Sequence, residues 1–524
     1  MVYFVFLFLI ASMMVVPSKF ILLMIQQNRY ELERYIAWFK ANKKEVLKQN
    51  ITAIIVMVAS IGALFAPSYY PMMIVGGLIF LKIIIDVYVE AKKQYIKPLK
   101  YTKRVLRQIA LIIILDGLWL MLCYQYIPES FYILVLWMSL WINQGIIVLA
   151  IYMLAPLERF FHKQFMKQGK KKLKGIPGLQ VIGITGSYGK TSTKNVLQEI
   201  LSSKYYSLMT PESFNTPMGI TITIKKHLTR LHQLFICEMG ADHVGDIEEL
   251  MNFVEPSYGI VTSIGPQHLN TFKTIENIIQ EKMKAIEMLP QTGVGVLNMD
   301  NTLIREYEVK NTCKLVRVAI DHEDADLRAT DIEYSTSGSK FNVVINDQVV
   351  PFETKLLGKH NIMNILVSIA IGLEMKVTPR ELQRAIKRCN YVSHRLELKK
   401  INGYTFIDNA FNSNPSGAAM SLEVLSRMPG NRFVVTPGMI DLGEQQESLN
   451  YEFGKQMFNQ VDTCILVGKN QTQSIYQGLS ESGFDMDQVI VTDTVQQAFK
   501  VVYQLASLQD VILLENDMPD AFNH

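Results

Sequence analysis

Long apolar runs with few charges occupy the first part of the chain. They lie at residues 1–26, 51–66, 70–88, 109–127 and 130–155. About 20 apolar residues in a helix can cross a bilayer core of about 30 Å, so the pattern predicts a membrane bundle of about five spans over residues 1–156. The run at 51–66 is short, and we expect it to form a tight hairpin with the run at 70–88.

Lysine and arginine residues follow the first, third and fifth runs, whereas the two other loops contain neither. Because cytoplasmic loops are enriched in these residues, the N-terminus is predicted outside and everything after residue 156 in the cytoplasm. We therefore expect a multi-pass protein of the cell membrane, in contact with membrane lipids.

Two features of this region leave alternatives open. Residues 27–49 mix aromatic with basic residues, which fits either a helix lying on the inner leaflet or a solvated linker. Asp116 and Asn143 lie within apolar runs, where polar groups are costly and often functional. Hydrogen bonding between helices is the favoured interpretation for this pair.

The pattern changes after the last apolar run. Residues 157–178 are basic and end in Gly175-Ile-Pro-Gly178, which predicts a linker. From residue 179 onward, short β-branched runs alternate with helical patterns, as in a mostly parallel sheet covered on both faces. Strands are expected at Leu179–Ile184, Leu234–Cys237 and Gly259–Thr262, and helices near 194–202, 274–288 and 361–374.

The alternation restarts near residues 391–402, which predicts a second, smaller α/β domain of Rossmann-like type. Its strands are expected at Tyr404–Asp408, Arg432–Thr436, Thr463–Val467, Gln488–Val491 and Val511–Leu514. The predicted architecture is thus a membrane bundle, a central α/β domain of P-loop type at 179–391, and a C-terminal domain at 392–524.

Composition narrows the function classes. Hydrophobic residues make up 49% of the chain, and the formal charge is only +4, with many lysines beside the apolar runs, so nucleic-acid binding is not indicated. The five cysteines are scattered without a CxxC pair, which indicates neither a disulfide framework nor a zinc site and suits a reducing compartment.

The candidate chemistry begins at Thr185-Gly186-Ser187-Tyr-Gly189-Lys190-Thr191-Ser192, which joins a strand pattern to a helical one. The glycines let the backbone approach phosphates, Lys190 supplies a positive charge, and the Thr191 hydroxyl can reach Mg²⁺. Ile184 stands where the first P-loop glycine belongs, and an ordinary strand-to-helix turn is the alternative. The stretch predicts binding of ATP or GTP.

Three further residues follow predicted strands or lie in a predicted helix: Glu238, His268 and Lys282. Each has an ordinary explanation alone, as a cap, a packed histidine and a solvated lysine. Beside a phosphate loop, Glu238 and His268 are typical of metal ligands.

These motifs together resemble the Mur ligases, ATP-dependent amide-forming enzymes of cell-wall synthesis whose phosphate loop also lacks the first glycine. The resemblance covers about 175–524 and includes Leu357-Gly-Lys-His-Asn361-Ile-Met-Asn364, His394-Arg395-Leu and Ile407-Asp408-Asn-Ala-Phe-Asn412-Ser-Asn414-Pro415. The last stretch is most similar to the branch that adds D-alanyl-D-alanine to UDP-muramoyl-tripeptide.

The resemblance implies a role for each matching residue. Lys190 and the loop amides would hold the β- and γ-phosphates of ATP, Thr191 and Glu238 one Mg²⁺, and His268 a second metal ion. Lys282 matches the family's carbamylated lysine. Within the motif that holds Asn361, Asn364 would face the adenine; Asp408 would contact the ribose, and Arg395 would reach toward the nucleotide.

The implied reaction joins a carboxylate acceptor to the amine of an amino acid or dipeptide through an acyl phosphate. The family's N-terminal UDP-binding domain is replaced here by the apolar region, and a stretch expected to be basic, within Leu514–Asp520, is acidic. We therefore expect a lipid-linked or membrane-proximal cell-wall precursor as the acceptor.

Three alternatives remain: the D-alanyl-D-alanine-adding reaction proper, an ATP-driven transporter, and an inactive ligase that anchors partners. The first would be distinguished by activity on a soluble precursor, and the second by uptake into vesicles. The third would leave the cellular phenotype of Lys190→Ala unchanged.

Overall fold

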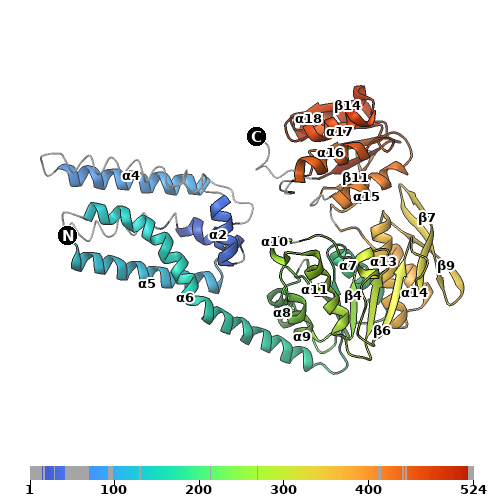
Figure 1. Ribbon diagram of the computed structural model, residues 1–524, viewed down its shortest axis with the longest axis horizontal. Coiled ribbons are helices and arrows are strands. Elements are labelled where there is room, and N and C mark those ends of the chain that lie inside the picture. The colour runs from blue at the N-terminus through green and yellow to red at the C-terminus, as the bar shows by residue number, and fades with distance from the viewer. Residues whose placement is uncertain are drawn as a thin grey trace. The chain divides into compact units, whose positions relative to one another are not determined.

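The computed structural model describes residues 15, 18–28, 30–41, 70–92, 98–128, 132–212, 214–267, 269–392, 394–410, 415–439, 442 and 445–516. It divides into two compact units, Met1–Gln164 and Phe165–His524, whose elements are drawn in Figure 1.

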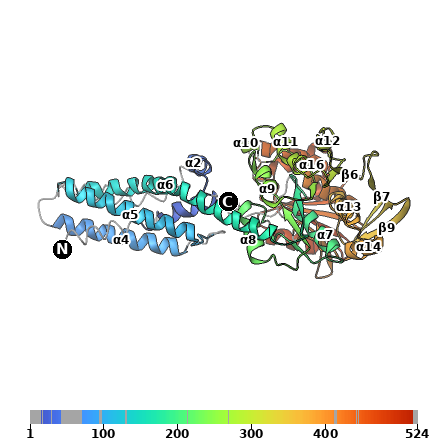
Figure 2. The ribbon, with the colours of Figure 1, turned by 90° about the horizontal axis from the view of Figure 1, so that it is seen from below.

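The first unit is helical. Its elements are α2 (Leu32–Ala41), α4 (Tyr70–Lys92), α5 (Lys103–Tyr126) and the first part of α6 (Tyr132–Lys174), and Figure 2 shows α4, α5 and α6 side by side. Within the described part of the chain, two helical segments are long and apolar enough to cross a membrane, Lys103–Tyr126 and Ile142–Lys174. By length and composition these helices overlap two of the five predicted runs, and a multi-span membrane bundle stays a prediction. The runs at 1–26 and 51–66 fall largely outside the described residues.

Polar side chains connect the helices of this unit. Asn143 Nδ2 donates a hydrogen bond to Asp116 Oδ2 at 2.9 Å, and Ser18 Oγ donates to Asn143 Oδ1 at 3.1 Å. The interpretation of Asp116 and Asn143 as partners between helices is therefore confirmed. Residues 32–41 form α2, and its place at a membrane surface stays a prediction.

Most of the basic segment predicted as a linker at 157–178 is helical, because α6 continues to Lys174. The basic residues are good helix formers, and cations in the last turn interact favourably with the helix dipole. Lys170 and Lys174 lie 2.7 and 2.9 Å from the carboxylate oxygens of Glu255. The end of α6 belongs to the second unit, and these ion pairs join it to the end of α9 (Asp246–Val254).

The second unit contains two sheets. The larger has nine strands in the order β2-β3-β1-β4-β5-β6-β7-β8-β9. Its strands are β1 Gln180–Thr185, β2 Ser207–Met209, β3 Leu234–Glu238, β4 Tyr258–Val261, β5 Val294–Asn298, β6 Lys314–Ala319, β7 Leu327–Ser335, β8 Gly338–Ile345 and β9 Gln348–Thr354. The pairs from β2 to β7 are parallel and the last two pairs antiparallel, so the prediction of a mostly parallel sheet is confirmed.

Helices cover both faces of this sheet (Figure 1). The helices are α7 Lys190–Leu201, α8 Pro217–Lys226, α9 Asp246–Val254, α10 Leu269–Phe272, α11 Ile275–Glu287, α12 Thr302–Arg305, α13 Lys359–Glu374 and α14 Pro379–Arg388. On β1, Ile182 and Ile184 pack with α7, α13 and α14, whereas Val181 packs with α8, α9 and α11. This alternation is the period-two pattern of a strand buried on both faces.

The smaller sheet has the order β10-β11-β15-β12-β13-β14. Its strands are β10 Glu397–Ile401, β11 Tyr404–Asn409, β12 Arg432–Thr436, β13 Thr463–Val467, β14 Val489–Thr492 and β15 Val511–Glu515, with helices α15 Pro415–Ser426, α16 Gln446–Gln456, α17 Gln473–Ser482 and α18 Val495–Leu505. The pair β10–β11 is antiparallel and the other pairs are parallel. The five predicted strands are confirmed, β12 and β13 to the residue.

Candidate functional site

Three neighbouring strands of the larger sheet end at the same edge. The loop after β1 contains Gly186–Lys190, β3 ends at Glu238, and β4 is followed by Thr262–Gly265; β1 pairs with both β3 and β4. Ligands of open α/β sheets bind outside the carboxyl ends of the strands. The strand order therefore brings the sequence-predicted loop and Glu238 to one site.

The two glycines of the loop are required by their surroundings. Gly186 and Gly189 have φ angles of +149° and +84°, which side chains rarely adopt. A Cβ atom at Gly186 would lie 2.1 Å from Thr262 Oγ1, and one at Gly189 would lie 2.7 Å from Asn364 Oδ1. Gly189 is the N-cap of α7 and no side chain caps this helix, so its N-terminus faces the loop without a side-chain acceptor, as in phosphate sites.

Lys190 lies above the loop and bonds to its carbonyl oxygens. Its Nζ donates to Gly186 O at 2.6 Å and to Ser187 O at 3.2 Å. Burial lowers the pKa of Lys190 to about 8, with Glu238 raising it and Arg395 lowering it. Ser192 lies half-buried in the first turn of α7, and Thr185 is fully buried at the end of β1.

Lys282, on α11, approaches the same carbonyl group. It is 1% exposed, and its Nζ donates to Gly186 O at 3.2 Å. Burial and the nearby charge of Lys190 lower the pKa of Lys282 to about 7, against the opposing charges of Glu281 and Asp246. Near neutral pH a large share of this amine is therefore unprotonated and nucleophilic.

Glu238 is surrounded by hydrogen-bond donors. Thr191 Oγ1 lies 3.1 Å from its Oε2, and Asn215 Nδ2 donates to its Oε1 at 3.2 Å. Lys194 Nζ donates to Oε2 at 2.9 Å. Sequence reasoning missed Lys194 and Asn215. Lys194 could have been found, because it lies one helical turn after Lys190 and so on the same face of α7.

The two asparagines of the motif at 357–364 differ in their hydrogen bonds. Asn364 Oδ1 accepts a hydrogen bond from Thr193 Oγ1 at 3.0 Å, while its Nδ2 is buried with no hydrogen-bond partner in the described structure. Asn361 Nδ2 instead donates to Leu357 O at 2.8 Å. Asn364 thus keeps a donor for a ligand beside Gly189, whereas the amide nitrogen of Asn361 is used within its own motif.

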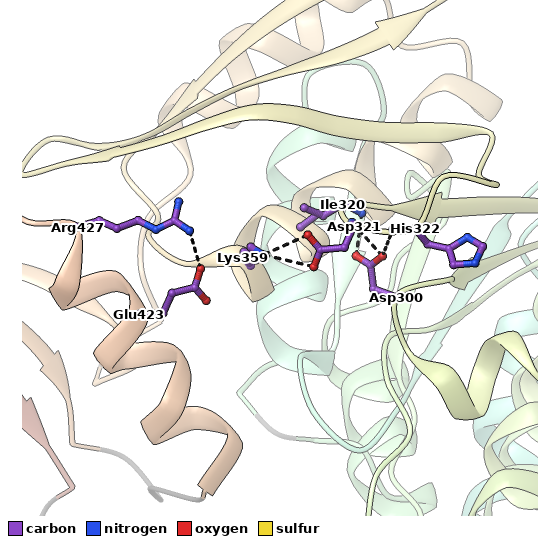
Figure 3. Close-up of polar contacts among 7 residues, drawn as sticks. All are labelled: Asp300, Ile320, Asp321, His322, Lys359, Glu423 and Arg427. Atoms are coloured by element: carbon purple, nitrogen blue, oxygen red, sulfur yellow. Dashed lines mark hydrogen bonds and ion pairs between the residues drawn. The ribbon is translucent and has the colours of Figure 1, made fainter. Parts of the chain in front are cut away.

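Polar contacts join the loops after strands β5 and β6 to the start of α13 (Figure 3). The Asp300 carboxylate accepts hydrogen bonds from the backbone N–H groups of Ile320, Asp321 and His322 at 2.7, 3.1 and 2.9 Å. Asp321 in turn pairs with Lys359 at 3.1 Å. The lysine of the 357–364 motif is therefore bound to a neighbouring loop.

The C-terminal candidates lie around β10 and β11. Asp408 is 5% exposed and accepts from Lys399 Nζ at 2.6 Å, with His394 Nδ1 at 2.9 Å. Burial alone would raise the pKa of Asp408, but the hydrogen bonds from Lys399, Ala410 and His394 hold it below the usual value. Burial lowers the pKa of Arg395. Separately, the positive charge of Arg395 lowers the pKa of Lys190. Arg395 is thus within electrostatic reach of the phosphate loop.

The residues present fit a metal ion that binds together with a nucleotide. In the described ranges there is no group of three His, Cys, Asp or Glu side chains that could hold an ion. Mg²⁺ is usually held by one or two carboxylates together with substrate phosphates and water. Thr191 and Glu238 provide such a partial set, and His268 lies outside the described residues, so its role as a metal ligand stays a prediction.

Comparisons with known proteins agree with this geometry. Residues 184–372 match the Mur ligase middle domain, and residues 394–515 match the glutamate ligase domain of Mur ligases. The chain is 27% identical over 293 residues to the UDP-N-acetylmuramoyl-tripeptide–D-alanyl-D-alanine ligase of Escherichia coli K12, covering 55% of this chain and 65% of that protein. The corresponding ligase of Bacillus subtilis 168 is 27% identical over 345 residues, covering 64% of this chain and 73% of that protein.

Solved structures show the same fold. MurF from Acinetobacter baumannii aligns with a TM-score of 0.60 and 21% identity, covering 68% of this chain and 77% of that one. MurF from Thermotoga maritima in complex with ADP aligns with a TM-score of 0.59 and 23% identity, covering 68% and 80%.

Proposed function

This chain belongs to the Mur ligase family, and from that premise we propose that it is an ATP-dependent carbon–nitrogen ligase acting on a peptidoglycan precursor. The relatives' names favour the reaction that joins D-alanyl-D-alanine to UDP-N-acetylmuramoyl-tripeptide. The observation that carries the proposal is the grouping of Lys190, Glu238 and Lys282 at the carboxyl edge of one sheet.

The first step activates the acceptor. A carboxylate oxygen of the acceptor attacks the γ-phosphorus of ATP in line, and the bond to the β–γ bridging oxygen breaks to release ADP. Lys190 and the N-terminus of α7 neutralise the charge that develops on the phosphates. Thr191 and Glu238 would hold Mg²⁺, which supplies further charge neutralisation when bound.

The second step forms the amide. The donor amine attacks the carbonyl carbon of the acyl phosphate, the C–O bond to phosphate breaks, and the amine loses a proton. The products are an amide, ADP and inorganic phosphate. Phosphorylation is needed because an unmodified carboxylate oxygen is a poor leaving group.

Lys282 is suited to the carbamate that the family resemblance implies. Its neutral amine would attack CO₂, forming an N–C bond and releasing a proton. The product is anionic, and Lys190 lies close enough to influence the charge of Lys282. The carbamate would then help to position the metal ion or the phosphorylated substrate.

The acceptor expected first, a lipid-linked precursor, is less well supported than the soluble nucleotide-linked one in the relatives' names. What still favours a membrane-proximal acceptor is the N-terminal region, which precedes the matched residues 184–515 and holds two helices of membrane-spanning length. The transporter alternative finds no support, since both matched domains are ligase domains. Location at the cytoplasmic face of the membrane stays a proposal.

The test uses the purified full-length protein with ATP, Mg²⁺, D-alanyl-D-alanine and UDP-N-acetylmuramoyl-tripeptide, with a lipid-linked muramoyl-tripeptide in a parallel reaction. We expect a product whose mass is the sum of tripeptide precursor and dipeptide minus water, formed only with ATP and formed much more slowly by Lys190→Ala. Faster conversion of the lipid-linked acceptor would indicate that the same reaction takes place on a membrane-bound precursor. Absence of any ATP- and amine-dependent product with either acceptor would contradict the proposal.

A further inference from the structure

One buried lysine of the site has no role in the mechanism above. Lys194 lies on α7 one turn after Lys190, and its side chain and that of Glu238 are each 1% exposed. Its Nζ lies 2.9 Å from Glu238 Oε2 and also donates to the backbone oxygen of Glu212. The ammonium group is therefore fixed on the carboxylate oxygen that Thr191 also contacts.

The other two lysines of the site bond differently. Lys190 Nζ donates to Gly186 O and Ser187 O, and Lys282 Nζ donates to Gly186 O. These carbonyl groups are neutral partners, which the oxygen atoms of a phosphate can replace. Lys194 alone of the three donates a hydrogen bond to the Glu238 carboxylate.

The charges at this edge set how a metal ion can enter. Lys190, Lys194 and Arg395 are cationic groups around Glu238. A bare dication approaching Glu238 meets a carboxylate whose negative charge is already offset by the Lys194 ammonium group at 2.9 Å. A metal ion that arrives with polyphosphate brings the negative charge that these groups attract.

We propose that Lys194 makes metal binding at Glu238 depend on the nucleotide, by occupying the carboxylate as an internal cation until the phosphates arrive. The inference rests on the proposed function, in which Thr191 and Glu238 hold the metal ion. Lys194 acts through Glu238 and is a positioning residue rather than a catalytic one. The consequence is that ATP and its metal ion bind as one unit, and that free Mg²⁺ does not fill the site.

The experiment measures Mn²⁺ binding by electron paramagnetic resonance, with and without ADP, for the full-length protein and for Lys194→Met, Lys194→Gln and Lys194→Arg. We expect the wild-type protein to bind Mn²⁺ at least 100-fold more tightly with ADP than without. In Lys194→Met, affinity without ADP should rise at least tenfold, and the effect of ADP should shrink accordingly. Lys194→Arg keeps the charge and should behave as wild type.

The controls separate the possible failures. Lys204→Met removes an exposed lysine whose Nζ bonds to Lys376 O and should change nothing. If Lys194→Met does not fold, Lys194→Gln keeps a donor for Glu238 while removing the charge, and should show the same rise in Mn²⁺ affinity. Unchanged or weaker Mn²⁺ binding without ADP in a folded, uncharged variant would overturn the inference. Failure of the wild-type protein to bind Mn²⁺ in the presence of ADP would instead overturn the proposed function.

Discussion

The carboxyl edges of the two sheets differ in the partners to which their charged residues are bonded. At the edge of the larger sheet, Lys190 and Lys282 bond to neutral carbonyl oxygens and have lowered pKa values. At the edge of the smaller sheet, the acid Asp408 is matched by Lys399 and His394. Glu515, at the end of β15, accepts from Ser421 Oγ at 2.6 Å and Asn409 Nδ2 at 2.9 Å.

This difference separates two tasks that similar folds can perform. At the first edge, cations bonded to neutral carbonyl groups are available to a polyphosphate, which fits the reaction chemistry proposed there. Acids already matched by donors are fixed in place, which suits the orientation of a ligand at the second edge. Four predictions test this division, in order of decreasing effect.

The largest effect is expected from Lys190→Ala. Removing the cation at the phosphate loop should lower kcat/KM by about 100- to 1000-fold, because charge developing on the transferred phosphoryl group loses a preorganised donor. Steady-state release of phosphate measures this loss, with the exposed-lysine variant Lys204→Met as a matched control. A fall in kcat/KM of less than about tenfold would mean that residues other than Lys190 contact the phosphates.

Lys282 should reveal its lowered pKa in the stability of the protein. The folded-state pKa of about 7 lies below the usual lysine value of 10.5, so the unfolded chain binds more protons between these two pH values. The free energy of unfolding should therefore rise with pH across this window. Urea denaturation of wild type and Lys282→Met at pH 7 and pH 9.5 measures the effect, and Lys282→Met should lose part of the rise. Equal pH dependence in both proteins would contradict a buried, destabilised ammonium group.

Asp408→Asn should act on binding rather than on chemistry. The substitution leaves Lys399 and His394 with a weaker acceptor at β11, and we expect KM for ATP to rise about tenfold with kcat within about threefold. Loss of one hydrogen-bonded charge of this kind costs about 1–3 kcal/mol. A selective fall in kcat would instead assign reaction chemistry to the second edge.

The smallest effect is expected at the Lys359–Asp321 pair. Both side chains are substantially exposed, at 34% and 67%, and exposed ion pairs contribute about 0–1 kcal/mol. Lys359→Gln should therefore change the free energy of unfolding by less than about 1 kcal/mol and leave kcat/KM nearly unchanged. A tenfold loss of activity would mean that this lysine serves the reaction directly.

Some elements could be predicted from the sequence because local pattern determines them. The strands β12 and β13 are β-branched or apolar runs bounded by polar residues. The phosphate loop can be identified by its glycines and its lysine. The antiparallel strands β7, β8 and β9 were missed because their residues alternate between buried and exposed without long apolar runs. Asn346 and Asp347, with φ angles of +51° and +61°, give a two-residue hairpin turn that could have identified β8 and β9.

Contacts between residues far apart in the chain could not be predicted from the sequence. Lys194 and Glu238 are 44 positions apart, and only the order β3-β1 in the sheet brings them together. The helical conformation of residues 157–174 was not predicted, because basic composition was given more weight than helix propensity. The pKa of Lys282 depends on burial and on Lys190, neither of which a single position in the sequence reveals.

The proposed reaction depends on activation of a carboxylate by phosphorylation at the edge of the larger sheet. The most direct test is to supply an acceptor whose carboxylate carries ¹⁸O and to measure the mass of the inorganic phosphate released during amide formation. Transfer through an acyl phosphate predicts one ¹⁸O atom in each phosphate. Release of unlabelled phosphate at the same rate as amide formation would contradict the account.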